Sequence, residues 1–343
     1  MAAPHQRLLI LTDGSLGVFD SKTATCLLRY RPGDVVGVLD RGHAGKTAAD
    51  VLGVPSHAPI VATMEEGLAL RPDALVIGIA PPGGALPAHW RAMISQALER
   101  GVSVLSGLHV FLADDPGYAA LAEISGASIV DYRRPPEGQP IAHRDALKTR
   151  ARRVLTVGTD CNIGKMVAAV ELDKSARGRG LSSRFLATGQ TGMLISGSGL
   201  TLDRIPGDFM AGFIEQMVVE NGDADLVIVE GQGCILHPAF SGVTMALLHG
   251  SLPDAMILVH HAARQIMRSQ TLSLPPLADW VRRYEDAVAP LHPGKVTGIA
   301  INPYGLTEAE ASDALRRAED ETGLPAVDVV KDGADRLLEG VLN

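Results

Sequence analysis

Residues 154–166 carry the clearest chemical signal in the chain, because they read VLTVGTDCNIGKM, an apolar run followed by a glycine-rich turn ending in Gly-Lys. A strand, a glycine loop and a helix with lysine in its first turn form a phosphate cradle, since loop N–H groups and the helix dipole face the anion. Gly158 ends the strand, Gly164 permits close backbone approach, and Lys165 adds a full charge. The stretch therefore predicts a phosphate-binding loop, and a turn that binds no ligand is the structural alternative.

The ligand is expected to contact this loop along its whole length. The residues assigned to donor or cofactor binding are Gly158, Thr159, Cys161, Asn162, Gly164, Lys165 and Met166, with Asn302 at the end of a later apolar run. Asn302 occupies the position at which related folds contact a base. Cys161 lies where a helix N-terminus lowers a thiol pKa, so catalytic use of the thiol stands beside a simple loop-filling role.

The loop departs from its common form just after the lysine. A serine or threonine there normally ligates Mg²⁺ through its hydroxyl, but here the residue is Met166, and the first glycine lies one position further back. A thioether is a poor ligand for Mg²⁺, which prefers oxygen. Thr159 offers a hydroxyl from the wrong end of the loop. We therefore expect phosphate binding without a required metal, with an ordinary Mg-ATP site as the alternative.

Polar side chains follow the apolar runs of the second half of the chain. Because parallel strands end at one edge of a sheet, we expect these side chains to gather near Lys165. The candidate acids and bases are Asp160, Glu230, His237 and His260. The candidate substrate contacts are Gln190, Arg204, Asp208, Ser241 and Arg264. The two arginines suit a substrate carboxylate, which guanidinium groups bind in a bidentate manner.

Each of these assignments has a structural alternative. Glu230 ends an apolar run, as the metal-sensing acid of P-loop proteins does, but it could instead cap the following turn. For each histidine a structural, hydrogen-bonded role stands equally open. His260 and His261 are adjacent on a strand and point to opposite faces, so they are not expected to share a metal ion. The chemistry that these residues indicate is acyl or phosphoryl transfer.

The elements that position these residues alternate between apolar runs and helical patterns. In the first half, the predicted strands are 7–12, 35–40, 74–80 and 103–108. In the second half, strands are predicted at 184–189, 225–233, 256–264 and 297–305, in addition to the strand before the phosphate loop. This alternation predicts α/β architecture with parallel, doubly wound sheets. No G-x-G-x-x-G occurs in the first half, so a nicotinamide cofactor is not supported.

Three connecting segments lead to further predictions. Residues 40–47 read DRGHAGKT, and Lys46 could contact an anion there or begin an ordinary solvated helix. Residues 80–87 read APPGGALP and predict a rigid loop at a carboxyl edge of the sheet. The basic segment 143–153 predicts a solvated linker helix, with a patch for donor phosphates as the alternative. A break at 135–140 sets the domains at 1–140 and 141–343.

Composition limits the function classes. The chain has 343 residues, 46% of them apolar but only 4% aromatic, which predicts aliphatic cores in two domains. A net charge of −8 argues against electrostatic nucleic-acid binding. Only three cysteines occur, far apart, which is typical of a reducing cytoplasm. We find no signal peptide and no membrane-spanning run. We expect small-molecule substrates, a homo-oligomer (a dimer or larger), and neither nucleic-acid nor membrane partners.

The motifs together resemble known proteins. The loop VGTDCNIGKM is similar to the GTD-x-x-x-GK loop of dethiobiotin synthetase and other MinD-like P-loop proteins. With its flanks, the chain resembles a two-domain family, long of unknown function, that includes D-glutamate N-acetyltransferase. The segments that carry this resemblance are DRGHAGKTAADVLG, GIAPPGGALP, SGLHVFL, ATGQTGMLISG, VEGQGCILHPAFSG and LLHGSLPDAMILVHH, within about residues 35–305.

The resemblance implies a Rossmann-like N-terminal domain and a P-loop NTPase-like C-terminal domain, each with a parallel sheet. It also implies acetyl transfer from acetyl-CoA to the amino group of D-glutamate, in D-amino-acid catabolism. Two other function classes stay open. One is an ATP- and Mg-dependent ligase or kinase resembling dethiobiotin synthetase, which Asp160, Lys165 and Glu230 would suit. The other is a non-catalytic nucleotide sensor.

Overall fold

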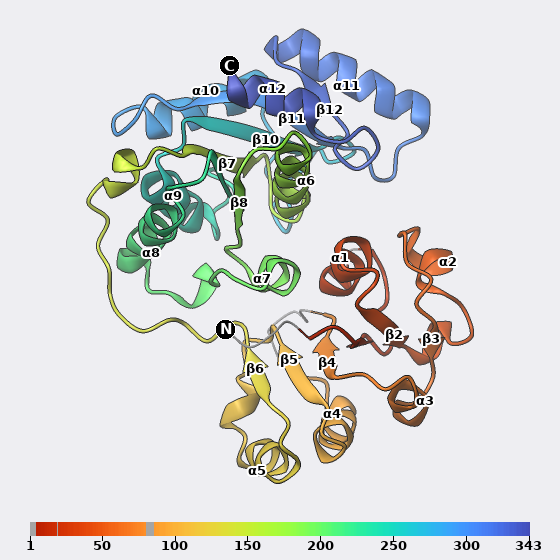
Figure 1. Cartoon of the computed structure of the whole chain (residues 1–343). Coiled ribbons are helices and arrows are strands. Elements are labelled where there is room, and N and C mark those ends of the chain that lie inside the picture. The colour runs from red at the N-terminus through yellow and green to blue at the C-terminus, as the bar shows by residue number, and fades with distance from the viewer. Residues whose placement is uncertain (1–4, 19, 80–85) are drawn as a thin grey trace. The chain divides into compact units, whose positions relative to one another are not determined.

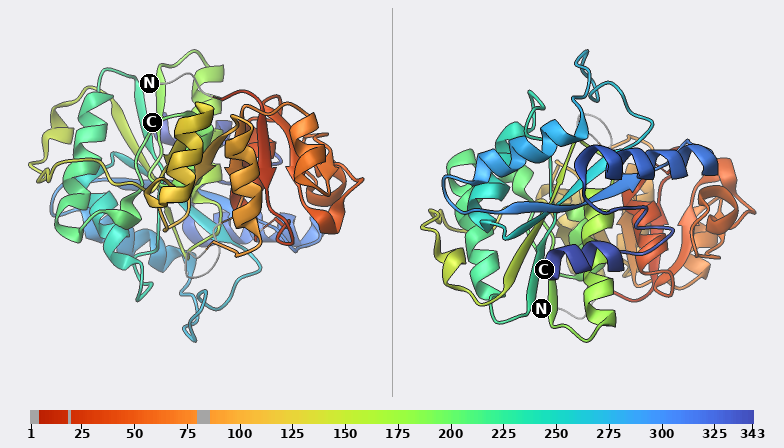
Figure 2. Two further views of the ribbon diagram at one scale, coloured as in Figure 1. Left: turned by 90° about the horizontal axis from the view of Figure 1, so that it is seen from below. Right: turned by 90° about the horizontal axis from the view of Figure 1, so that it is seen from above.

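The computed structural model divides into two compact units (Figure 1). It describes residues 5–18, 20–79 and 86–343. Each unit holds a six-stranded sheet in which all pairings between the described strands are parallel, and helices lie on both faces of each sheet (Figure 2). The predicted α/β class with two parallel sheets is therefore confirmed.

The first unit comprises residues Met1–Pro135 and Met193–Arg204. Its sheet has the order β3-β2-β1-β4-β5-β6. The strands are β1 (Leu8–Leu11), β2 (Val35–Leu39), β3 (Ile60–Val61), β4 (Ala74–Ile77), β5 (Ser103–Ser106) and β6 (Ile129–Asp131). The helices are α1 (Lys22–Tyr30), α2 (Ala48–Leu52), α3 (Met64–Ala69), α4 (Trp90–Glu99) and α5 (Pro116–Ser125). The four predicted strands are present, whereas the short edge strands β3 and β6 were not predicted.

Two loops of the first unit bear on the sequence predictions. In segment 40–47 the buried Asp40 accepts hydrogen bonds from Thr12 Oγ1 and from the N–H groups of Gly14 and Leu16, so this carboxylate orders the strand ends. Lys46 is exposed beside α2, and ligand contact by it remains a prediction. The predicted rigid loop at 80–87 lies outside the described residues except for its last two positions.

The second unit comprises Pro136–Gly192 and Ile205–Asn343, and its sheet has the order β12-β11-β10-β7-β9-β8. The strands are β7 (Arg152–Gly158), β8 (Ser183–Leu186), β9 (Leu226–Val229), β10 (Ala255–His261), β11 (Lys295–Asn302) and β12 (Ala326–Val327). The helices are α6 (Lys165–Gly178), α7 (Gln190–Ser196), α8 (Gly207–Glu220), α9 (Ser241–Ser251), α10 (Leu277–Val288), α11 (Glu308–Thr322) and α12 (Asp335–Leu342). Because β7 lies between β10 and β9, the glycine loop that follows it starts at the middle of the sheet edge.

Residues Met193–Arg204 leave the second unit within α7 and belong to the first. Leu194 is buried in the aliphatic cluster of the first unit, and its carbonyl accepts a 2.9 Å hydrogen bond from Arg31 Nη1. Thr201 Oγ1 donates to the Tyr132 carbonyl. The sequence analysis placed this segment in the C-terminal domain, because no local sequence pattern indicates that residues Met193–Arg204 pack into the first unit.

The predicted linker helix at 143–153 is wrong. The structure has only a short 3-10 helix, Asp145–Lys148, before the chain enters β7 at Arg152. Arg153 is buried and its Nη2 lies 2.6 Å from Asp254 Oδ1, so this charge is neutralised inside the fold. The basic residues looked like a solvated surface because the partner carboxylate lies far away in the sequence.

Candidate functional site

The phosphate loop runs from Thr159 to Gly164 between β7 and α6. Asn162 and Gly164 have φ angles of 52° and 112°, left-handed values that are common in anion-binding loops. A Cβ at Gly158 would lie 2.8 Å from Ile163 Cδ1 and 3.1 Å from Lys165 Nζ, so a side chain there would displace the end of Ile163 or of the lysine. The backbone therefore has the form that the motif predicted.

The side chain of Lys165 lies over this loop. It is only 6% exposed, and its Nζ donates a 2.6 Å hydrogen bond to the Asp160 carbonyl. From β11, Asn302 Nδ2 donates to the Ile163 carbonyl at 3.0 Å, which fixes the far side of the loop. Met166, at the position of the usual Mg²⁺-binding hydroxyl, is 1% exposed and packs in the core. That position supplies packing and no oxygen ligand.

Asp160 joins the loop to the segment that follows β10. It is fully buried, and its Oδ1 accepts a hydrogen bond from Cys161 N at 2.7 Å. Its Oδ2 accepts from Arg264 Nη1 at 2.9 Å and from Arg268 N at 2.7 Å. Both oxygens are therefore engaged, which suits a positioning role better than proton transfer. Arg264 Nη1 also donates to the Cys161 carbonyl at 2.8 Å, and within the described residues its Nε and Nη2 donors remain for a ligand.

His237 is held by two hydrogen bonds. Its Nδ1 accepts from Ala239 N at 3.2 Å, and its Nε2 faces the Arg268 carbonyl at 3.1 Å. These partners fix a neutral ring that carries its proton on Nε2, so neither nitrogen has a free lone pair. We interpret His237 as a structural histidine that braces the segment around Arg268.

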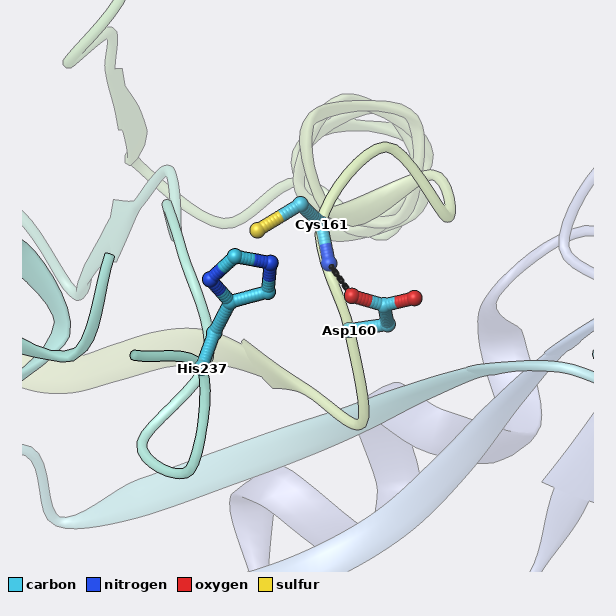
Figure 3. A group of neighbouring side chains, drawn as sticks. All are labelled: Asp160, Cys161 and His237. Carbon is cyan, nitrogen blue, oxygen red and sulfur yellow. Dashed lines mark hydrogen bonds between the residues drawn. The ribbon is translucent and has the colours of Figure 1, made fainter. Parts of the chain in front are cut away.

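Asp160, Cys161 and His237 lie close enough for a metal site, since one ligand atom of each lies within 4.8 Å of the others. Figure 3 shows the Cys161 thiol beside the imidazole, whereas one oxygen of the Asp160 carboxylate accepts the hydrogen bond from Cys161 N and the other points away. Both His237 nitrogens are occupied, and Arg264 neutralises Asp160. Burial raises the pKa of the Cys161 thiol, which opposes the thiolate that a metal requires. These three residues fit a metal poorly.

His260 remains as the candidate proton acceptor. Its Nδ1 lies 2.9 Å from Thr159 Oγ1, directly beside the phosphate loop. Burial, with smaller contributions from the neighbouring His261 and Arg264, lowers the pKa of His260 to about 4. The ring is therefore neutral near pH 7, and the tautomer with hydrogen on Nδ1 leaves the Nε2 lone pair open.

The lowered pKa predicts a loss of stability in mild acid. The unfolded chain takes up a proton at His260 near pH 6.5, whereas the folded chain does so only near pH 4. The contribution of neutral, buried His260 to the free energy of unfolding is therefore fully present above pH 6.5 and decreases as the pH falls toward 4. Chemical denaturation at pH 7.5 and pH 5 should show a smaller decrease for His260→Asn than for the wild type. An equal decrease in both proteins would contradict the assignment.

Glu230, at the end of β9, holds the segment between β8 and α7. Its buried carboxylate accepts a 3.0 Å hydrogen bond from Thr188 N, and its carbonyl accepts from Thr188 Oγ1. Gly192 passes so close to this carboxylate that no side chain fits there. Glu230 thus orders the start of α7, where Gln190 is the first residue. Substrate contact by Gln190 remains a prediction.

The other predicted substrate contacts are dispersed. Ser241 begins α9, and its N–H donates to the His237 carbonyl at 3.0 Å, while Asp208 is exposed in the first turn of α8. Arg204 was expected on the sheet edge that carries Lys165. By its contacts Arg204 belongs to the first unit, where its guanidinium lies over the Phe111 ring at 5.0 Å, and substrate contact by Arg204 remains a prediction.

Comparisons with known proteins agree with this architecture. A family model described as the DUF1611 C-terminal P-loop domain matches residues 140–338, and one described as the DUF1611 N-terminal Rossmann-like domain matches residues 41–135. The chain belongs to the DUF1611 family. A crystal structure of a DUF1611 family protein from Anabaena variabilis is 41% identical, with a TM-score of 0.94, covering 98% of this chain and 99% of that one.

Two curated relatives have names that state an activity. A protein named D-glutamate N-acetyltransferase from Tritonibacter scottomollicae is 40% identical over 340 residues, which is 97% of each chain. A second protein of that name, from a Pseudoalteromonas species, is 34% identical over 80% of this chain and 82% of its own length. The family resemblance read from the motifs is thus confirmed.

Tyr284 is a residue of this DUF1611 site that the sequence analysis missed. Its fully buried hydroxyl donates a 2.6 Å hydrogen bond to the Gly158 carbonyl and accepts one from Ile235 N at 3.2 Å. Burial raises the pKa of this phenol, which keeps it protonated. Tyr284 lies four residues after Trp280 on α10, and that spacing predicts only that both side chains lie on the buried face of a helix. The sequence contains no signal that connects it to the loop.

Proposed function

We propose that this chain transfers the acetyl group of acetyl-CoA to the amino group of D-glutamate, as a step of D-amino-acid catabolism in the cytoplasm. The observation that carries the proposal is the relationship, over nearly the whole chain, to a D-glutamate N-acetyltransferase. An intact phosphate loop without a hydroxyl at Met166 supports it, since the phosphates of CoA do not react. Among the described residues, no helix is long and apolar enough to cross a bilayer.

The reaction places three demands on the site. The phosphates of the donor need cations and N–H groups, which the loop and Lys165 offer. The ammonium of the acceptor must lose a proton before its nitrogen attacks the thioester carbonyl, and the C–S bond then breaks to leave N-acetyl-D-glutamate and CoA thiol. His260 suits the proton transfer best, because the hydrogen-bonding atoms of Asp160 and His237 are already engaged.

This proposal predicts that turnover needs no divalent ion. An acetyl thioester is already activated, so acyl transfer has no triphosphate charge for Mg²⁺ to neutralise. Incubation with acetyl-CoA and D-glutamate in EDTA should release free thiol at an undiminished rate, with or without ATP. If EDTA stops turnover and Mg²⁺ restores it with formation of ADP, the chain is a ligase or kinase, the function that Asp160, Lys165 and Glu230 would suit.

A further inference from the structure

A pocket of about 450 Å³ opens in the second unit beside His260 and Arg264. Its walls come from the segment after β10, the start of α10 and the helix α11. The apolar part of the lining includes Leu274, Pro275, Leu277, Ile301 and Ala318. This volume lies within the usual range for small-molecule sites. His260 and Arg264 connect the pocket to the phosphate loop through Thr159 and Asp160.

The pocket is lined by two positively charged side chains and one negatively charged side chain. Arg264 and Arg317 supply two guanidinium groups, and Glu321 supplies one carboxylate. Arg317 projects from α11 and has no hydrogen bond or ion pair within the described part of the chain, whereas its neighbour Arg316 pairs with Asp313. One oxygen of Glu321 accepts a 3.0 Å hydrogen bond from Ala278 N, and no residue that the structure describes bonds the other, which is left for a ligand.

We propose that this pocket binds the acceptor, an amino acid with two carboxylates, an inference that rests on the proposed acetyl transfer. Such a molecule carries two carboxylates and one ammonium, which match the remaining N–H donors of Arg264, the guanidinium of Arg317 and the carboxylate of Glu321. Arg264 is tied to the phosphate loop, so it holds the α-carboxylate, which is bonded to the same carbon as the reacting amine. Arg317 lies outward on α11 and holds the side-chain carboxylate.

The alternative occupant with suitable charge is a phosphate of the donor. Glu321 disfavours that assignment, because an anionic oxygen beside a phosphate is repulsive. The apolar wall also suits the methylene groups of an amino dicarboxylate. His260 lines the same pocket, so its imidazole would lie beside the amino group of a bound acceptor. The pocket therefore combines acceptor recognition with the proton acceptor.

The test compares Arg317→Ala with the matched control Arg316→Ala on the same helix. Arg317→Ala should raise the KM for D-glutamate about tenfold, the usual effect of losing one charged hydrogen-bonded contact. It should also reduce the preference for D-glutamate over D-glutamine, because the contact to the side-chain carboxylate is lost. The KM for acetyl-CoA should stay within about twofold. Arg316→Ala should change none of these quantities.

The outcomes separate the pocket from the proposed function. Wild-type protein that acetylates D-glutamate, together with an Arg317→Ala variant of normal D-glutamate KM and unchanged selectivity, would overturn only the pocket assignment. A raised KM for acetyl-CoA with a normal KM for D-glutamate would reassign the pocket to the donor. Wild-type protein that acetylates no amino acid would refute the proposed function itself. Thermal shift with D-glutamate alone would then report directly on acceptor binding.

Discussion

Replacing Lys165 by alanine is expected to raise the KM for acetyl-CoA at least about tenfold, because one charged contact to a phosphate contributes roughly 1.5–3 kcal/mol. The Lys165 ammonium already lies over the loop, with Nζ bonded to the Asp160 carbonyl at 2.6 Å, so it is positioned for an anion seated there. Initial-rate measurements at several concentrations of acetyl-CoA, with D-glutamate saturating, provide the test.

The matched control for this experiment is Lys174→Ala on the same helix. Lys174 is exposed and pairs with Glu171 at 3.0 Å, so its removal should leave both KM values unchanged. If Lys165→Ala kept a normal KM for acetyl-CoA, and for ATP, the loop would have no part in donor binding. Circular dichroism of both variants would confirm that any loss of affinity does not arise from unfolding.

The substitution Asp160→Asn should destabilise the second unit by about 3 kcal/mol, since it leaves the Arg264 guanidinium without its buried partner. Asparagine has one carbonyl oxygen and one NH2 group, so it cannot replace both carboxylate oxygens as acceptors. Asp160 Oδ2 now accepts a 2.7 Å hydrogen bond from the N–H of Arg268. A loss of this size lowers the melting temperature of a domain of 150–250 residues by roughly 6–12 °C. Calorimetry of the wild type and the variant measures it.

An exposed pair of the same chemistry provides the comparison for Asp160. Asp279 and Arg282 lie 2.8 Å apart on the surface of α10, and Asp279→Ala should cost about 1 kcal/mol or less. Because Asp160 positions the phosphate loop, Asp160→Asn should also raise the KM for acetyl-CoA. A variant with wild-type melting temperature and wild-type KM would show that the buried ion pair neither stabilises the loop nor shapes it.

The sequence alone was sufficient to predict the features that are formed by residues close together along the chain. The strand, the glycine loop and the helix of residues 154–178 are contiguous, so residue spacing sufficed to predict them and to place Lys165 in the first helical turn. The apolar runs likewise predicted the central strands of both sheets, because buried parallel strands are apolar throughout. Short edge strands such as β3 carry too few residues for a pattern. The missing hydroxyl at Met166 was also evident from the sequence.

Only the tertiary structure decided which polar groups are available for chemistry. Asp160, which the sequence presented as a base, is bonded to Arg264 and Arg268, which lie 104 and 108 positions further along the chain. Residues Met193–Arg204 lie between strands of the second unit in the sequence, but they pack into the first unit through Leu194. Residue spacing records the position of a charged group along the chain, whereas its partner and its burial arise from contacts between distant segments. The phosphate-binding loop could therefore be predicted from contiguous residues. Which polar groups near it remain available for a ligand could be seen only in the tertiary structure.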